Sequence, residues 1–274
     1  MTTAEHSSSP TAPYVDVPRV SLFGVPVATS TMPEVLTLCD DVITQGATMH
    51  IGVVNAAKIV NCGKDPVLRD SVLTSDVIYA DGMAVVWASK LLGRRLPERV
   101  AGIDLMMGLL EHGDSRGYRV YLLGAKEEIN AEVAARIEKD YPGVVVAGRR
   151  NGYFSDEDEQ SIAEDIAASK ADILFVAITS PKKERFQAQW ASTMNARIYH
   201  GVGGSFDVYA GLVERAPESW QRLGLEWLYR VKQEPRRLWK RYLVTNTAFV
   251  WLTLKERFRP TPTHPRPAQQ TTEG

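Results

Sequence analysis

The chain has 274 residues, of which 44% are hydrophobic and 24% are charged, and its formal net charge is −1. This composition is ordinary for a globular protein, and a chain of this length buries enough surface to fold without disulfides or structural metals. The five histidines and two cysteines show none of the close spacings of a zinc site, so we expect neither a metal nor a cofactor.

Both ends of the chain are predicted to be disordered. Residues 1–18 lack the basic start and apolar core of a signal peptide, and residues 260–274 are rich in Pro, Thr and Gln. Two isolated cysteines fit a reducing compartment. We therefore expect a cytoplasmic protein with an α/β domain over residues 19–229 and a basic appendage over residues 230–259.

Short apolar runs alternate with longer amphipathic stretches between residues 20 and 210. Continuous runs rich in Val and Ile are typical of buried parallel strands, and these runs are residues 50–55, 119–124, 144–148, 172–178 and 197–201. Helices are predicted over residues 126–141, 155–169 and 182–194, and residues 65–112 are predicted to be mainly helical around a short strand at VIYADG. This alternation predicts a Rossmann-like, mostly parallel sheet flanked by helices.

Polar residues and glycines follow the predicted strands directly. In sheets of this class ligands bind beyond the carboxyl ends of the strands, so these residues are predicted to line one shared crevice. They are Asn55, Asp81, Gly124, Gly148, Thr179 and Gly203.

Asp81 follows a predicted strand and precedes a predicted helix in the segment VIYADGMAV. A carboxylate in that place can accept the proton of an attacking hydroxyl, as a general base does. The Asp81-Gly82 pair is also a common turn sequence, and the dipeptide alone does not distinguish the two interpretations.

Two further positions have both a structural and a functional interpretation. Asn55 is suited to cap the helix that follows it, and it can also orient a substrate hydroxyl or the Asp81 carboxylate. Arg99, in the segment PERVAG that ends at Gly102, can bind a phosphate through its planar guanidinium. A lone arginine before a helix is more often simply solvated.

The glycine-rich segment GVGGSFD contains Gly203, Gly204 and Asp207. Its glycines let backbone amides approach a phosphate, and Asp207 can accept a hydrogen bond from a ribose hydroxyl. The segment SPKKE opens a helix with Lys183 near its start, where a cation opposes the helix dipole and indicates either an anion or a solvated lysine. The single glycine after Tyr121 does not continue into a dinucleotide fingerprint, which argues against an oxidoreductase.

Positive charge is concentrated near the C-terminus. Residues 230–259 contain nine basic and two acidic residues, a net charge of +7 against −8 for the rest of the chain. Trp and Phe are interleaved with these cations, and the uncharged stretch 242–254 is too short to span a bilayer. We predict a segment that binds an anionic membrane surface and not nucleic acid, with a helix docked on the core as the alternative.

Taken together, these motifs resemble the WecG/TagA/CpsF glycosyltransferase family. The resemblance runs from about residue 20 to residue 241 through VVNAAK, ADGMAVV, PERVAG, YLLGA, YPGVVVAGRRNGYF, SPKKE, GVGGSFDVYAG, ERAPESW and GLEWLYRVKQEPRRLWKRYL. It implies an inverting, metal-independent transfer of a sugar from a nucleotide donor, commonly UDP-linked, to an undecaprenyl-diphosphate-linked sugar in cell-surface polysaccharide synthesis. It also implies a peripheral location on the inner face of the plasma membrane.

The resemblance matches the family's proposed base to Asp81 and other site positions to Asn55, Arg99 and Asp207. Further substrate-binding residues are expected from the same motifs, namely Gly102, Gly124, Lys183, Gly203 and Gly204. The family's C-terminal region closes over the active site, and the candidates there for binding the diphosphate are Arg230, Arg236 and Arg237.

Two positions depart from the family pattern. Val53 stands where Thr is frequent, and Lys183 replaces the Gln of a PKQE-like motif. Both changes lie where the sugars are expected, so we hypothesise a donor other than N-acetylmannosamine, such as a glucose or glucuronate derivative. The alternative function is a non-catalytic, membrane-recruited scaffold on the same fold, and self-association into a homo-oligomer is compatible with the sequence.

Overall fold

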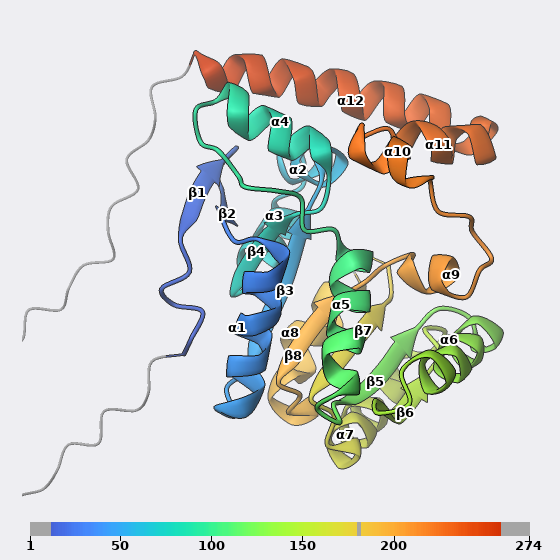
Figure 1. Cartoon of the computed structure of the whole chain (residues 1–274). Helices are drawn as coiled ribbons and strands as arrows, with labels where there is room; N and C mark the ends of the chain where they lie inside the picture. The colour runs from blue at the N-terminus through green and yellow to red at the C-terminus, as the bar shows by residue number, and fades with distance from the viewer. Residues whose placement is uncertain (1–11, 180–181, 259–274) are drawn as a thin grey trace, which may run out of the picture.

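The computed structural model describes residues 12–179 and 182–258, apart from the side chain of Arg237. At its centre is a six-stranded sheet of order β4-β3-β8-β7-β5-β6, in which all neighbouring strands are parallel (Figure 1). The strands are β3 (Met49–Val54), β4 (Val77–Ala80), β5 (Arg119–Gly124), β6 (Val145–Arg150), β7 (Ile173–Ala177) and β8 (Ile198–Gly201). The predicted α/β fold with a mostly parallel sheet is confirmed, and each predicted strand agrees to within two residues at either end.

Helices cover both faces of this sheet. They are α1 (Met32–Thr44), α5 (Gly102–Asp114), α6 (Glu127–Asp140), α7 (Glu159–Ser169), which follows the short helix η1 (Asp156–Asp158), and α8 (Lys182–Met194). Alternate residues of a strand face opposite sides, so Val120 and Leu122 of β5 pack with α1, α5 and α6. Tyr121 and Leu123 of the same strand pack with α7 and α8. All four side chains are fully buried.

A third core cluster surrounds the other edge of the sheet. It contains residues of β1 (Arg19–Leu22), β2 (Val25–Ala28), α2 (Ala56–Cys62), α3 (Pro66–Leu73) and α4 (Met83–Leu91). The antiparallel hairpin β1–β2 was not predicted, because its turn is Phe23-Gly24 and not the usual Asn-Gly or Asp-Gly. Both turn residues have the positive φ that such a tight turn requires, 56° for Phe23 and 77° for Gly24.

The C-terminal part of the chain forms α9 (Ser205–Tyr209), α10 (Glu218–Arg222), α11 (Glu226–Gln233) and the 23-residue helix α12 (Pro235–Arg257). In Figure 1, α12 crosses the top of the molecule next to α4 and above α2. Leu238 and Phe249 of α12 are buried, and Phe249 contacts Phe23 with ring centroids 5.3 Å apart. No helix in the described part of the chain is long and apolar enough to cross a membrane.

The structure covers only part of the two terminal segments predicted to be disordered. Residues 1–11 and 259–274 lie outside the described residues. Residues 12–18, part of the leader predicted to be disordered, form a turn whose Tyr14 and Val17 pack against the core. The predicted appendage begins at residue 230, which lies inside α11.

Candidate active site

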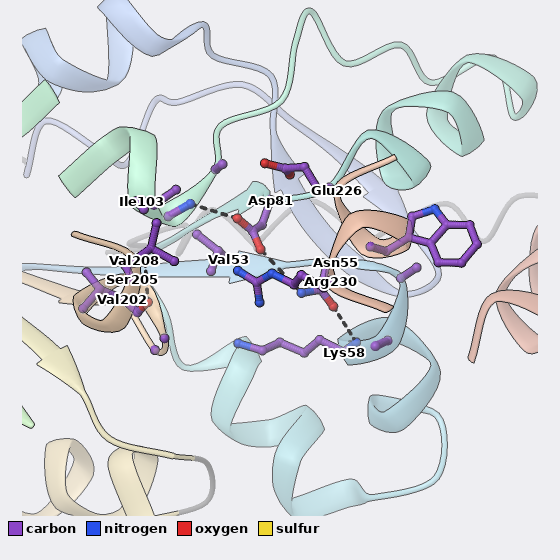
Figure 2. Close-up of a pocket in the computed structure, with 18 of the residues that line it drawn as sticks. Val53, Asn55, Lys58, Asp81, Ile103, Val202, Ser205, Val208, Glu226 and Arg230 are labelled. Atoms are coloured by element: carbon purple, nitrogen blue, oxygen red, sulfur yellow. Dashed lines mark hydrogen bonds between the residues drawn. The ribbon is translucent and has the colours of Figure 1, made fainter. Parts of the chain in front are cut away.

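A pocket of about 480 Å³ opens at the carboxyl ends of β3, β4, β7 and β8. The first turns of α2, α4 and α5 form part of its wall, and residues of α11 and α12 close one side (Figure 2). Its polar side chains are Asn55, Lys58, Asp81, Thr179, Lys183, Ser205, Glu214, Arg215, Glu226, Trp227, Arg230, Arg241, Tyr242 and Asn246. Of the residues predicted to share a crevice, Asn55, Asp81, Thr179 and Gly203 are brought together here.

The Asp81 carboxylate faces the pocket and is held at both oxygens. The backbone N–H of Gly102, the first residue of α5, donates to Oδ1 at 2.9 Å, and the Asn55 amide donates to Oδ2 at 3.4 Å (Figure 2). A helix N-terminus favours a nearby negative charge, so the first turn of α5 is a favourable place for this carboxylate. A fixed carboxylate that faces an open pocket has the geometry of a general base.

Asn55 has both of the roles that its sequence context allows. Its Oδ1 accepts a hydrogen bond from the backbone N–H of Lys58 at 3.0 Å, which caps α2, while its Nδ2 donates to Asp81. A side-chain amide can do both because its acceptor and its donor are different atoms. The helix cap therefore also fixes the orientation of the group that holds the carboxylate.

His200 lies fully buried beneath Gly102 at the third position of β8. Its Nε2 is 2.9 Å from the Gly102 carbonyl oxygen, and because that oxygen can only accept, Nε2 carries the proton. Nδ1 is buried and has no hydrogen-bond partner among the described residues. His200 thus connects β8 to the residue whose N–H holds Asp81. Sequence reasoning missed it, because a lone histidine in an apolar strand carries no catalytic spacing.

The burial of His200 predicts a loss of stability in acid. Burial lowers the pKa of His200 to about 4, whereas an unfolded histidine titrates near 6.5. As pH falls from about 6.5 to about 4 the unfolded chain binds this proton first, so up to about 3 kcal/mol of unfolding free energy is lost. The free energy of unfolding, measured with urea at about pH 7 and about pH 4.5, should change less between the two pH values in His200→Gln than in the wild type. Equal pH dependence in the two proteins would contradict the assignment.

Arg99 lies outside the pocket lining, in a cluster of ion pairs at its rim. Its guanidinium contacts Asp104 at 3.1 Å and Glu226 at 2.5 Å. Arg215 contacts the same two carboxylates, at 2.5 Å and 3.9 Å. The cluster joins the first turn of α5 to α11 and so holds α11 beside the pocket. Phosphate binding by Arg99 stays a prediction, because its contacts in this structure are carboxylates.

The predicted glycine positions have different locations. Gly102, Gly203 and Gly204 line the pocket. Gly124 does not, and its φ of +128° and a Cβ position only 2.4 Å from the Ala177 backbone explain the glycine by the close approach of β5 and β7. Asp207 is half-buried in α9 and does not line the pocket either.

The three C-terminal arginines predicted to bind the diphosphate do not all line the pocket. Arg230 lines the pocket from α11, whereas Arg236 is exposed and outside the lining, and the Arg237 side chain is outside the described residues. Sequence reasoning missed five other lining residues of α11 and α12, namely Glu226, Trp227, Arg241, Tyr242 and Asn246. Their spacing was a usable signal, because residues three or four apart share one face of a helix.

Both departures from the family pattern, Val53 and Lys183, line the pocket. Lys58, which was not singled out from the sequence, lines it as well. Burial and then the neighbouring Lys183 lower the pKa of Lys58 to about 8. Within residues 12–179 and 182–258, no group of three or more His, Cys, Asp or Glu side chains is placed to hold a metal ion.

Comparison with known proteins identifies the family to which this pocket belongs. The model of the glycosyl transferase WecG/TagA/CpsF family matches residues 20–263. The chain is 42% identical over 175 residues to the N-acetylglucosaminyldiphosphoundecaprenol N-acetyl-beta-D-mannosaminyltransferase of Bacillus spizizenii, a match that covers 64% of this chain and 67% of the relative. The resemblance seen in the short motifs is confirmed, and the chain belongs to the WecG/TagA/CpsF family of glycosyltransferases.

Proposed function

We propose that this glycosyltransferase moves a sugar from a UDP-linked donor onto a sugar carried by undecaprenyl diphosphate, with Asp81 as the general base. The observation that carries the proposal is the Asp81 carboxylate, fixed by Gly102 and Asn55 inside the pocket. The name of the Bacillus spizizenii relative supports the acceptor, because it specifies N-acetylglucosaminyldiphosphoundecaprenol. We extend this acceptor to the present chain.

The proposed reaction needs a base for the acceptor and positive potential for the leaving nucleotide. The acceptor oxygen forms a bond to the anomeric carbon while its proton passes to Asp81. The bond from that carbon to the diphosphate breaks on the opposite face, which inverts the anomeric centre, and UDP leaves with the electron pair. Arg230 and Arg241 line the pocket from α11 and α12 and can stabilise the charge of the leaving group.

A donor screen tests this proposal. UDP-sugars are offered one at a time with a short-chain lipid-diphosphate N-acetylglucosamine acceptor, and transfer of radiolabel is measured. The name of the relative favours N-acetylmannosamine, whereas Val53 and Lys183 led us to expect a different donor. If UDP-N-acetylmannosamine is the one donor that gives product, the hypothesis of a different donor is rejected. No product from any donor would contradict transfer to this acceptor.

The non-catalytic scaffold is tested by a separate pair of measurements. A scaffold has no need for a carboxylate oriented by two donors, so the arrangement around Asp81 favours an enzyme. A thermal-shift assay with UDP, followed by an assay of donor hydrolysis, separates the two functions. Binding of UDP with no hydrolysis or transfer would favour the scaffold.

We also propose that the outer face of α12 binds the inner surface of the plasma membrane. Its large apolar side chains are 44–67% exposed, namely Trp239, Leu243, Val244, Val250, Trp251 and Leu254. Lys240 and Lys255 are exposed on the same helix. Apolar and basic side chains on one exposed helix are suited to the interface of an anionic bilayer. Self-association through the same face stays a competing prediction.

Vesicle flotation tests the membrane proposal. Lys240→Gln and Lys255→Gln should each weaken binding to anionic vesicles about fivefold, because a cation near such a surface contributes about 1 kcal/mol. Trp251→Ser should weaken it further by removing apolar contact. Lys139→Gln, at an exposed lysine of α6, is the matched control and should bind like the wild type. Equal flotation of all four variants would contradict the proposal.

A further inference from the structure

Two lysine side chains share the pocket with Asp81. Lys58 comes from α2 and Lys183 from α8, and both belong to the lining. Figure 2 shows Lys58 extending from α2 into the pocket, below Asp81 and Arg230 in that view. The Lys183 ammonium lies against the end of β8, because a Cβ added to Gly201 would be only 2.8 Å from its Nζ. The two ammonium groups therefore enter one cavity from different elements.

This arrangement is unfavourable for the empty protein. The two positive charges repel each other, and burial followed by that repulsion lowers the pKa of Lys58 to about 8, against the opposing effect of the Glu184 and Asp81 carboxylates. Lys183 is the second residue of the 13-residue helix α8, where the helix dipole disfavours a cation. It is compensated in part by Glu184, which lies 3.1 Å away.

Two other charged residues of the pocket lining are held in ion pairs. Arg215 is paired with Asp104 at 2.5 Å, and Glu226 with Arg99 at the same distance. Lys58, by comparison, forms no ion pair with any residue in the described ranges 12–179 and 182–258. A bound anion between the two lysines would offset both their repulsion and their desolvation.

We propose that Lys58 and Lys183 form an anion subsite that holds one oxyanion of the nucleotide sugar, either a phosphate of its diphosphate or a carboxylate on its sugar. The inference rests on the proposed function, because it assigns a group of the substrate to the Asp81 pocket. Its residues belong to α2 and α8, so it is distinct from the arginines of α11 and α12. An ammonium has three donors around a compact charge, which suits either oxyanion.

The test compares binding of UDP, UDP-glucose and UDP-glucuronate by calorimetry to the wild type, Lys58→Met and Lys183→Gln. These substitutions remove the charge while keeping an unbranched side chain, and Lys139→Met on α6 is the control. If the anion is a phosphate, each pocket variant should bind all three ligands about 10- to 100-fold more weakly. If it is a sugar carboxylate, only UDP-glucuronate should lose this factor. Wild-type affinities for all three ligands in both variants would overturn the subsite.

Thermal unfolding without ligand separates a binding role from a structural one. Lys58→Met removes one of two repelling charges and breaks no ion pair among the described residues, so the unliganded variant should be as stable as the wild type or more stable. Lys183→Gln also removes the ion pair with Glu184, so its stability does not serve this comparison. Weaker binding together with a lower unfolding temperature in Lys58→Met would show that this lysine serves the fold, and would overturn the subsite. A wild-type protein that binds none of the three ligands would instead contradict the proposed function itself.

Discussion

Replacing Asp81 by asparagine is expected to lower kcat by about 10²–10⁴-fold, the usual contribution of a general base. Asparagine has nearly the shape of aspartate, and its amide oxygen can still accept the 2.9 Å hydrogen bond from the Gly102 N–H. It cannot accept a proton from the acceptor hydroxyl at neutral pH. Steady-state transfer assays with the donor found by the screen would measure the effect on kcat and KM separately.

Asn55→Ala is the companion variant for this experiment. It removes the cap of α2, which should cost about 1 kcal/mol of unfolding free energy, and it frees Asp81 Oδ2 from its weaker hydrogen bond. The carboxylate itself remains, so the loss of kcat should be smaller than for Asp81→Asn. Turnover near the wild-type value in Asp81→Asn, with normal unfolding, would reject the assignment of the base.

Arg99→Met should release α11 from the rim of the pocket. Arg99 bridges Asp104 and Glu226, and its side chain is only 12% exposed, so its loss leaves two partly buried carboxylates with Arg215 alone. The expected cost is about 1–3 kcal/mol, below that of a fully buried pair because both carboxylates are partly solvated. Since α11 carries Trp227 and Arg230 into the pocket, we expect kcat/KM to fall by about 10-fold or more.

Two further variants make this prediction specific. Arg99→Lys should recover only part of the activity, because a single ammonium cannot reproduce the geometry of a guanidinium that contacts two carboxylates. Arg149→Met removes the exposed Arg149–Glu127 pair, which joins β6 to α6 outside the pocket, and should behave like the wild type. Equal kinetics for Arg99→Met and Arg149→Met would show that the cluster does not position α11.

The sheet was predictable because its signal is local. Continuous apolar runs such as residues 119–124 and 172–178 are typical of strands that are covered on both faces. Because ligands bind beyond the carboxyl ends of such strands, Asn55 and Asp81 were predicted to lie together. The same rule also selected Gly124, whose glycine instead serves the contact between two strands. The rule therefore predicts correctly at which edge of the sheet such a residue lies, but it does not predict whether the residue lines the pocket at that edge.

The residues that the sequence did not reveal act through distant partners. His200 matters because it contacts Gly102, a residue 98 positions away in the chain. Glu226 matters because Arg99, 127 positions away, binds it. The spacing of nearby residues does not indicate either contact. His200 and Glu226 each lie in a segment whose composition is ordinary for a strand or a helix.

The pocket is assembled from residues as far apart in the chain as Val53 and Asn246. A chain emerging from the ribosome exposes its N-terminal segments first, so the sheet and Asp81 can form before α11 and α12 are synthesised. Until those helices dock, the third core cluster lacks Phe249 and the pocket lacks Arg230 and Arg241. The complete site should therefore form only after α12 has been synthesised, and a nascent chain can be folded at its centre while its site is still incomplete.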